Sequence, residues 1–155
     1  MRRQTEAQLQ VQVADYIRTK YPNVLFHSDY GSGVKLTMPQ AVMQKRQNGG
    51  RRSWPDIFIA YPIFKLPKDK TVHDYVQEGD MGKWNKFQDS MRHGLFIELK
   101  REGTRIFKKD GTLVSDEHIR EQYDLLEQLR HDCGYEACFA CGFEEAKKII
   151  DDYLA

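Results

Sequence analysis

The sequence predicts an α/β domain in which a central mixed β-sheet is flanked by helices. Two apolar runs of strand length, 57–60 and 94–99, are rich in β-branched and aromatic residues, as buried strands are. A third run, 135–140, follows a stretch of helical periodicity, and a crossover of this kind places it in the same sheet, parallel to a neighbour. A chain of 155 residues is long enough for one core of ordinary size, so we expect a single domain over 1–155.

The first element is a helix that begins after Thr5 and ends near Lys20, because Thr5 and Gln8 form a capping-box pattern. Its inward stripe consists of Leu9, Val13 and Ile17, with Tyr16 beside them. Glu6 falls on the same stripe, where an acid is unusual. Two interpretations stay open for Glu6: a ligand of a metal or of a metal-bound water, or a first-turn acid favoured by the helix dipole.

A short strand, 24–27, and a short helix, 39–47, follow between glycine-containing turns. His27 ends the strand, and we interpret a lone histidine there as structural rather than catalytic. The connection 61–93 is much longer than the usual hairpin loop of about 2–5 residues, so we expect an insertion. Its interleaved basic and aromatic residues would suit unpaired bases or a distorted junction, while a lid or a dimer-contact arm fits equally well.

The second half continues with a possible β-hairpin at Asp110-Gly111 and a helix over about 116–131 that Ser115 would cap. Its inward stripe comprises Ile119, Tyr123, Leu126 and Leu129 or Arg130, and Gln122 points inward with them. A glutamine there could support a site, or it could simply bond to backbone in the interior. A final helix over about 143–153 packs on the sheet.

The net charge is only +1, so any nucleic-acid binding depends on local clusters of basic residues. No acidic residue occurs between Asp29 and Asp56, whereas basic residues are frequent there and again after residue 100. Clusters near both charged strands suit a phosphodiester backbone, although solvated loops would look the same. The DNA-binding candidates are Lys45, Arg46, Arg51, Arg52, Arg101 and Arg105.

Several classes of protein are disfavoured. No apolar run approaches the roughly 20 residues that span a bilayer, and the N-terminus lacks an apolar signal segment, so we expect a cytoplasmic protein without a membrane partner. Cys138 and Cys141 have C-x2-C spacing, but positions three apart face opposite sides of a strand. With no second C-x2-C pair, the cysteines are interpreted as reduced thiols rather than a zinc site.

Two predicted strands carry charged residues at their ends. Asp56 follows Pro55 at the start of one, and Glu98-Leu99-Lys100 closes the other, with Glu98 and Lys100 on one face because their spacing is two. Burying such groups is costly unless something compensates them. A divalent cation would compensate both carboxylates, since hard cations such as Mg²⁺ take oxygen ligands and retain waters for substrate phosphates. The pattern predicts a metal site with Lys100 near the polarised water.

Pro55-Asp56 and Glu98-Leu99-Lys100 resemble the PD-(D/E)xK nuclease signature, and the order of flanking elements is similar to that of the VRR-NUC family, whose small stand-alone members are often phage-encoded. The resemblance implies a restriction-endonuclease-like core. It also implies Mg²⁺, with Mn²⁺ as a substitute, bound by Asp56, Glu98 and the Leu99 backbone carbonyl. By the same resemblance Lys100 activates water, Gln122 supports the site and Glu6 is an additional ligand.

The function implied by this resemblance is metal-dependent DNA cleavage that leaves a 5′-phosphate and a 3′-hydroxyl. Stand-alone VRR-NUC proteins resemble archaeal-type Holliday-junction resolvases, so we expect a homodimer that prefers branched DNA, in the host cytoplasm if the gene is viral, with no small-molecule cofactor. The alternatives are a non-catalytic DNA-binding or packaging accessory protein with the same fold, and an enzyme that acts on RNA. The insertion 61–93 and Trp54 before Pro55 depart from the family pattern.

Overall fold

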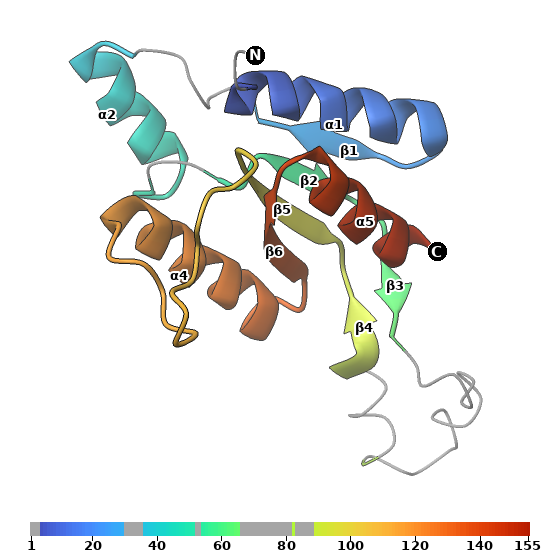
Figure 1. The fold of residues 1–155 in the computed structure, drawn as a ribbon. Helices are drawn as coiled ribbons and strands as arrows, with labels where there is room; N and C mark the ends of the chain where they lie inside the picture. The colour runs from blue at the N-terminus through green and yellow to red at the C-terminus, as the bar shows by residue number, and fades with distance from the viewer. Residues whose placement is uncertain (1–3, 30–35, 52–53, 66–81, 83–88) are drawn as a thin grey trace.

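The computed structural model describes residues 4–29, 36–51, 54–65, 82 and 89–155. A four-stranded sheet has the order β1-β2-β5-β6, in which β2 is antiparallel to both neighbours and β5 and β6 are parallel. Helices α1 and α5 cover one face of this sheet and α4 covers the other (Figure 1). The bounds are α1 Glu6–Lys20, β1 Phe26–Ser28, α2 Met38–Gln47, β2 Ile57–Ile59, β3 Ile63–Phe64, β4 Met91–Arg92, β5 Leu95–Lys100, α4 Glu117–His131, β6 Glu136–Cys141 and α5 Phe143–Leu154.

The helix starts follow local capping chemistry. Thr5 and Gln8 form the predicted capping box of α1, and Thr37 forms an equivalent box for α2. The predicted cap of α4 was wrong by one residue. Asp116, not Ser115, is the N-cap, because its carboxylate accepts a hydrogen bond of 3.0 Å from the Ile119 N–H.

Alternation along β2 and β5 divides the core between the two faces of the sheet. Ile57, Ile59, Leu95, Ile97 and Leu99 are buried with the apolar side chains of α1 and α5. The residues between them face α4, where Phe96 packs with Leu125, Leu126 and Leu129. The predicted stripe of α4 needs correction: Leu125 is buried and Tyr123 is only half-buried. β2 and β5 are the two inner strands of the sheet, so their side chains reach the helices on both faces.

The described ends of the segment 61–93 pair with each other. β3 and β4 form a two-stranded antiparallel ribbon, with Ile63 opposite Arg92 and Phe64 opposite Met91. The Tyr153 hydroxyl of α5 donates to the Tyr61 carbonyl at 2.7 Å, which joins the base of the ribbon to the main domain. Residues 66–81 and 83–88 lie outside the described part of the chain, so the expected roles of this segment stay predictions.

Among the described residues, no helix is both long enough and apolar enough to cross a bilayer.

Candidate active site

Four predicted site residues lie together on the face of the sheet that α4 covers. The exposed fractions of Asp56, Glu98, Lys100 and Gln122 are 7%, 5%, 6% and 8%. Charged side chains are rarely this deeply buried unless they are paired or bind a metal. The arrangement therefore concentrates two carboxylates, one ammonium group and one amide in a small, poorly hydrated volume.

The two strands position the acids through their backbones. Asp56 directly precedes β2, and its Oδ2 accepts a hydrogen bond of 2.8 Å from the Leu99 N–H of β5. The N–H and C=O of one strand residue point to the same edge, so the Leu99 carbonyl also faces Asp56. Lys100 uses the opposite edge, where its carbonyl accepts from the Gly142 N–H at 2.8 Å. The Leu99 carbonyl is thus on the edge of β5 that faces Asp56, where the predicted metal site would use it.

Glu98 receives hydrogen bonds from two sides. The Lys100 ammonium lies 2.9 Å from Glu98 Oε1, because the two residues share the α4 face of β5. The Gln122 amide, reaching down from α4, donates to the same oxygen. The alternative interpretation of Gln122, a glutamine that bonds only to backbone, is wrong: its side-chain partner is the carboxylate itself.

The raised pKa of Glu98 indicates that the site has too little positive charge to stabilise its carboxylates. Burial and, after it, the neighbouring Asp56 charge raise the pKa of this carboxyl to about 8, although the Lys100 ammonium acts in the opposite direction. The Glu6 charge also raises it, which places Glu6 within electrostatic reach. One ammonium group does not balance the carboxylates, so the site favours an additional positive charge.

A divalent cation fits these donors. Asp56, Glu98 and the Leu99 carbonyl offer the oxygen ligands that Mg²⁺ and Mn²⁺ accept. Within the described ranges there is no group of three or more His, Cys, Asp or Glu side chains arranged to hold a metal. An ion here would be held by the two carboxylates and the backbone carbonyl, while half-buried Glu6 acts electrostatically on Glu98.

Gln10 belongs to the site, and the helical pattern of α1 did not reveal it. Its exposed fraction is 7%, and its amide donates to Ser28 Oγ at 3.0 Å, to the Asp29 carbonyl and to the Asp56 carbonyl at 3.3 Å. The Asp29 N–H also donates to the Asp56 carbonyl, at 2.9 Å. Gln10 therefore fixes the backbone that carries Asp56. The only sequence feature that pointed to burial of Gln10 was its position next to Leu9, which belongs to the inward stripe of the helix.

Aromatic rings form the wall beside Asp56. Phe58 and Phe96 are stacked with centroids 4.4 Å apart, and Tyr135 meets both rings edge-on. The Trp54 side chain is 41% exposed, and its ring centroid lies 6.1 Å from that of Phe96. The tryptophan that departs from the family pattern thus extends an aromatic cluster toward the surface.

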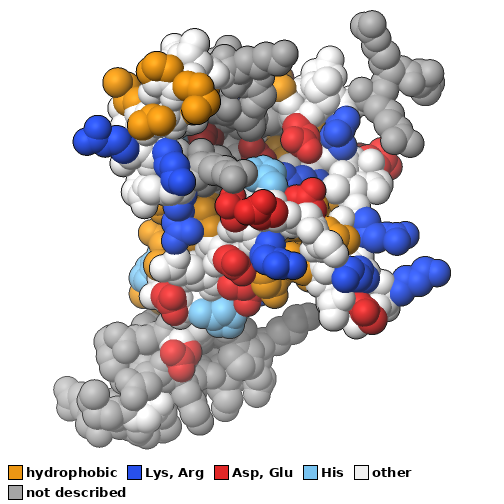
Figure 2. Space-filling view, turned by 90° about the vertical axis from the view of Figure 1, so that its left-hand side faces the viewer, with side chains coloured by type: hydrophobic (Ala, Val, Ile, Leu, Met, Phe, Trp, Pro, Cys, Tyr) orange, Lys and Arg blue, Asp and Glu red, His pale blue; other side chains and the backbone are white. Residues whose placement is uncertain are grey.

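The predicted DNA-binding residues divide between different surfaces. Lys45 and Arg51 line a cavity that also includes Gln122, so the fold brings them to the site. Arg46 instead lines a shallow hollow with Met38, Val42 and Met43 along exposed α2, next to which Lys and Arg side chains gather in Figure 2. Arg101 and Arg105 are exposed after β5, and Arg52 lies outside the described residues.

Comparison with known proteins extends these observations. The fold is similar to that of a solved structure described as a VRR_NUC domain protein, with a TM-score of 0.57 and 17% identity, covering 99% of this chain and 91% of the other. No protein-family model and no curated protein matches the sequence. The structural likeness confirms the predicted fold class, a central mixed sheet flanked by helices.

Proposed function

We propose that this protein is a metal-dependent DNA endonuclease that hydrolyses phosphodiester bonds. The observation that carries the proposal is the buried cluster of Asp56, Glu98, Lys100 and Gln122, in which Lys100 Nζ lies 2.9 Å from Glu98. The likeness to a VRR_NUC domain protein supports the nuclease assignment, because that name denotes a nuclease-type domain. We also infer one domain over 1–155, with 61–93 as an insertion, in a cytoplasmic protein.

Each residue has a distinct role in this proposal. Asp56, Glu98 and the Leu99 carbonyl would hold Mg²⁺ or Mn²⁺, which when bound polarises a water and the phosphate oxygens. Lys100 is placed to orient the attacking water and to stabilise the charge that develops on the phosphate. Gln122 keeps the Glu98 carboxylate oriented through its amide. Gln10 keeps the Asp56 backbone in place.

Cleavage of labelled DNA with and without Mg²⁺ tests this function. We expect Mg²⁺-dependent cutting by the natural protein and its loss in Asp56→Asn and in Lys100→Ala. Matched controls come from an exposed ion pair on α5, Lys148 and Asp152, which are 2.8 Å apart. Asp152→Asn and Lys148→Ala should cut normally. Undiminished cutting by Asp56→Asn would refute the assignment, and DNA binding without cutting by the natural protein would favour the accessory-protein alternative.

We further propose that the enzyme prefers branched DNA and acts as a homodimer. Symmetric cutting of a four-way junction needs paired active sites, which a twofold dimer provides. Comparing cleavage rates on four-way, flap and linear DNA tests the preference, and equal rates on all of them would contradict it. Sedimentation of the protein at several concentrations tests the dimer, and a monomer at every concentration would refute it.

A further inference from the structure

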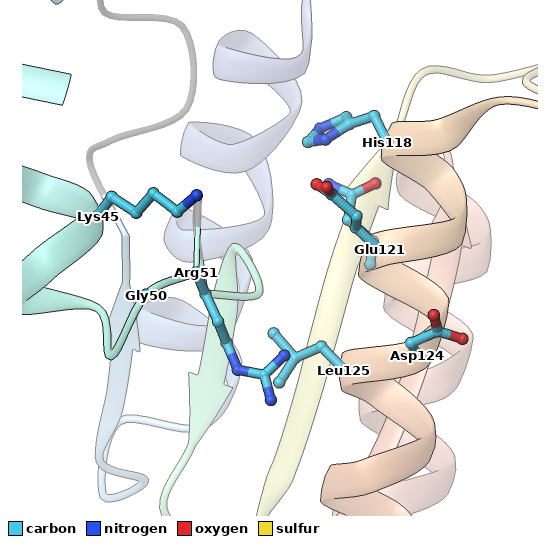
Figure 3. A pocket seen from close by; sticks show the side chains of 8 residues that line it. Lys45, Gly50, Arg51, His118, Glu121, Asp124 and Leu125 are labelled. Carbon is cyan, nitrogen blue, oxygen red and sulfur yellow. The ribbon is translucent and has the colours of Figure 1, made fainter. Parts of the chain in front are cut away.

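A cavity of about 290 Å³ lies between α2 with its following loop and the first half of α4 (Figure 3). One wall is made by Lys45, Gly50 and Arg51, and the opposite wall by His118, Glu121 and Gln122, with buried Leu125 below them. In Figure 3 the Lys45 side chain extends across the gap toward the α4 wall. The volume of the cavity lies just below the roughly 300–1,000 Å³ range of ligand pockets, so the cavity suits one nucleotide-sized group.

Gln122 connects this cavity to the active site. Its amide nitrogen donates to Glu98, whereas its Oε1 is buried and has no hydrogen-bond donor among the described residues. Gln122 is more than nine-tenths buried and also lines the cavity. A buried acceptor without a donor lowers the stability of the fold, so a donor from outside the described chain would stabilise this oxygen. A ligand in the cavity could supply that donor.

The α2 wall suits a phosphate. Within the described part of the chain, no carboxylate lies within ion-pair distance of the Lys45 ammonium. The Arg51 guanidinium donates to Gln128 on α4, which holds this side chain across the gap. Gly50 has φ of +87°, and nothing lies within 4 Å of where its Cβ would be, so a ligand can approach the backbone closely. These features favour an anion on this wall.

The α4 wall suits a base rather than a second phosphate. The Glu121 carboxylate and Gln122 Oε1 both accept hydrogen bonds, and an acidic side chain typically accepts from the amino group of cytosine. The exposed His118 ring lies one helical turn before Gln122 and can stack on a base. In a paired duplex the amino edge of the base is already occupied. The wall therefore matches a base that has left its partner.

We propose that this cavity binds one unpaired nucleotide of the DNA beside the phosphate that is cut, with its phosphate on Lys45 and Arg51 and its amino-bearing base on Glu121 and Gln122. This inference deepens the proposed nuclease function and rests on it for the neighbouring cleavage site. The substrate class that follows is DNA with an unpaired nucleotide at a bulge, flap or branch. Bases with an amino group at that edge are preferred over thymine.

Binding by the Asp56→Asn variant without metal tests the cavity separately from cleavage. Fluorescently labelled duplexes would carry one bulged cytosine, one bulged thymine, one bulged abasic site or no bulge. We expect the cytosine bulge to bind about fivefold more tightly than the thymine bulge, which corresponds to one discriminating hydrogen bond. The cytosine bulge should also bind at least about fivefold more tightly than the abasic and the fully paired duplexes. Equal affinities for all four duplexes would overturn the proposal.

Additional variants assign the preference to the cavity. With Asp56→Asn as background, Glu121→Ala should abolish the cytosine-over-thymine preference, and His118→Ala should weaken binding of both bulged bases relative to the abasic site. The control Glu144→Ala changes an exposed acid on α5 and should have no effect. Unfolding curves establish that the variants fold. A cytosine-over-thymine preference that survives in Glu121→Ala would refute the assignment of the base to this cavity. If the natural protein fails to cut with Mg²⁺ while the preference persists, the nuclease function fails and the cavity stands.

Discussion

Gln10 is a residue whose importance depends entirely on what the fold places opposite it. On α1 it is adjacent to the apolar stripe, and a helix position of this kind is compatible with either exposure or burial. The sheet brings Ser28, Asp29 and Asp56 to its amide. Because the Asp56 carbonyl accepts from both Gln10 and the Asp29 N–H, hydrogen bonds fix the backbone that carries the Asp56 carboxylate.

Gln10→Ala should destabilise the protein by about 1–3 kcal/mol, because buried acceptors lose their donor. Cleavage should also slow, since a small displacement of Asp56 disturbs the proposed metal site. Gln12→Ala is the matched control, because Gln12 is exposed on the same helix. Urea unfolding and single-turnover cleavage measure the two effects. Equal stability and rates for the two variants would show that Gln10 does not position Asp56.

Other site residues were predictable because their information is local. Glu98 and Lys100 share a face through the two-residue period of a strand, and Gln122 points inward through the helical period of α4. Both expectations were confirmed by the burial and mutual contacts of these side chains. The predicted N-cap of α4, Ser115, was wrong, because Ser and Asp both cap helices well and the backbone conformation places the cap at Asp116.

At the scale of elements, the approach of β2 to β5 depends on Gly94. A Cβ at this position would lie 2.6 Å from the Ile59 carbonyl oxygen and 2.8 Å from the Phe58 ring. Neither neighbour can withdraw easily, because Ile59 is paired with Leu95 and Phe58 is stacked on Phe96. Glycine therefore permits the close approach of β2 to β5, the strands that bring Asp56 next to Leu99.

Gly94→Ala should destabilise the protein by about 2–3 kcal/mol, as overpacking of a tight core does. The displaced β2 should also weaken cleavage, because Asp56 directly precedes this strand. Chemical denaturation and the cleavage assay measure both changes. An unchanged unfolding midpoint would mean that the sheet accommodates the methyl group without moving β2.

Asp151 joins the last helix to the first. Its carboxylate accepts hydrogen bonds from the Tyr16 hydroxyl at 2.6 Å and the Tyr21 hydroxyl at 2.7 Å, and it lies 2.9 Å from the Lys20 ammonium. Burial alone would raise the pKa of Asp151, but these hydrogen bonds outweigh it and lower the pKa to about 2. The ionised carboxylate therefore stabilises the contact between α1 and α5.

Asp151→Asn should cost about 1–2 kcal/mol at neutral pH, since bonds to an ionised acceptor are lost. The lowered pKa means that this stabilisation is present above the ordinary pKa of about 4 and disappears as the pH falls toward 2. The stability difference between the natural protein and Asp151→Asn should thus shrink across this window. Asp152→Asn, on the exposed neighbour, should show no such dependence. Unfolding curves at pH 7, 4 and 3 measure the difference, and a constant difference would contradict the assignment.

At the scale of the whole molecule, charge is distributed rather than concentrated. The net charge is +1, so long-range attraction to DNA is weak and local cations must supply the binding. Lys45 and Arg51 line the same cavity as Gln122 of the candidate site, whereas Arg46 lines the apolar hollow of α2. The proposed DNA contacts are therefore centred on the gap between α2 and α4.

DNA affinity should fall steeply with salt, with a log–log slope that approaches about −5 if all the candidate cations contact phosphates. Lys45→Ala should make this slope shallower by about 1, since one phosphate contact is removed. Lys148→Ala, which removes an exposed charge on α5, should leave it unchanged. Titrations of the metal-free Asp56→Asn background over a range of salt concentrations measure the slopes. Equal slopes for the two lysine variants would exclude Lys45 from the DNA contact.

The sequence by itself determined the order of the helices and the four main-sheet strands, the mixed sheet and the shared face of Glu98 and Lys100, because hydrophobic periodicity and capping act over a few residues. It did not reveal the β3–β4 ribbon. Only the tertiary structure decided that Gln10 supports Asp56, that Gly94 permits the β2–β5 approach, and that Lys45 and Arg51 oppose His118 and Glu121. These contacts join segments far apart in the chain. Their geometry depends on how helices and strands pack, and no short-range pattern encodes it.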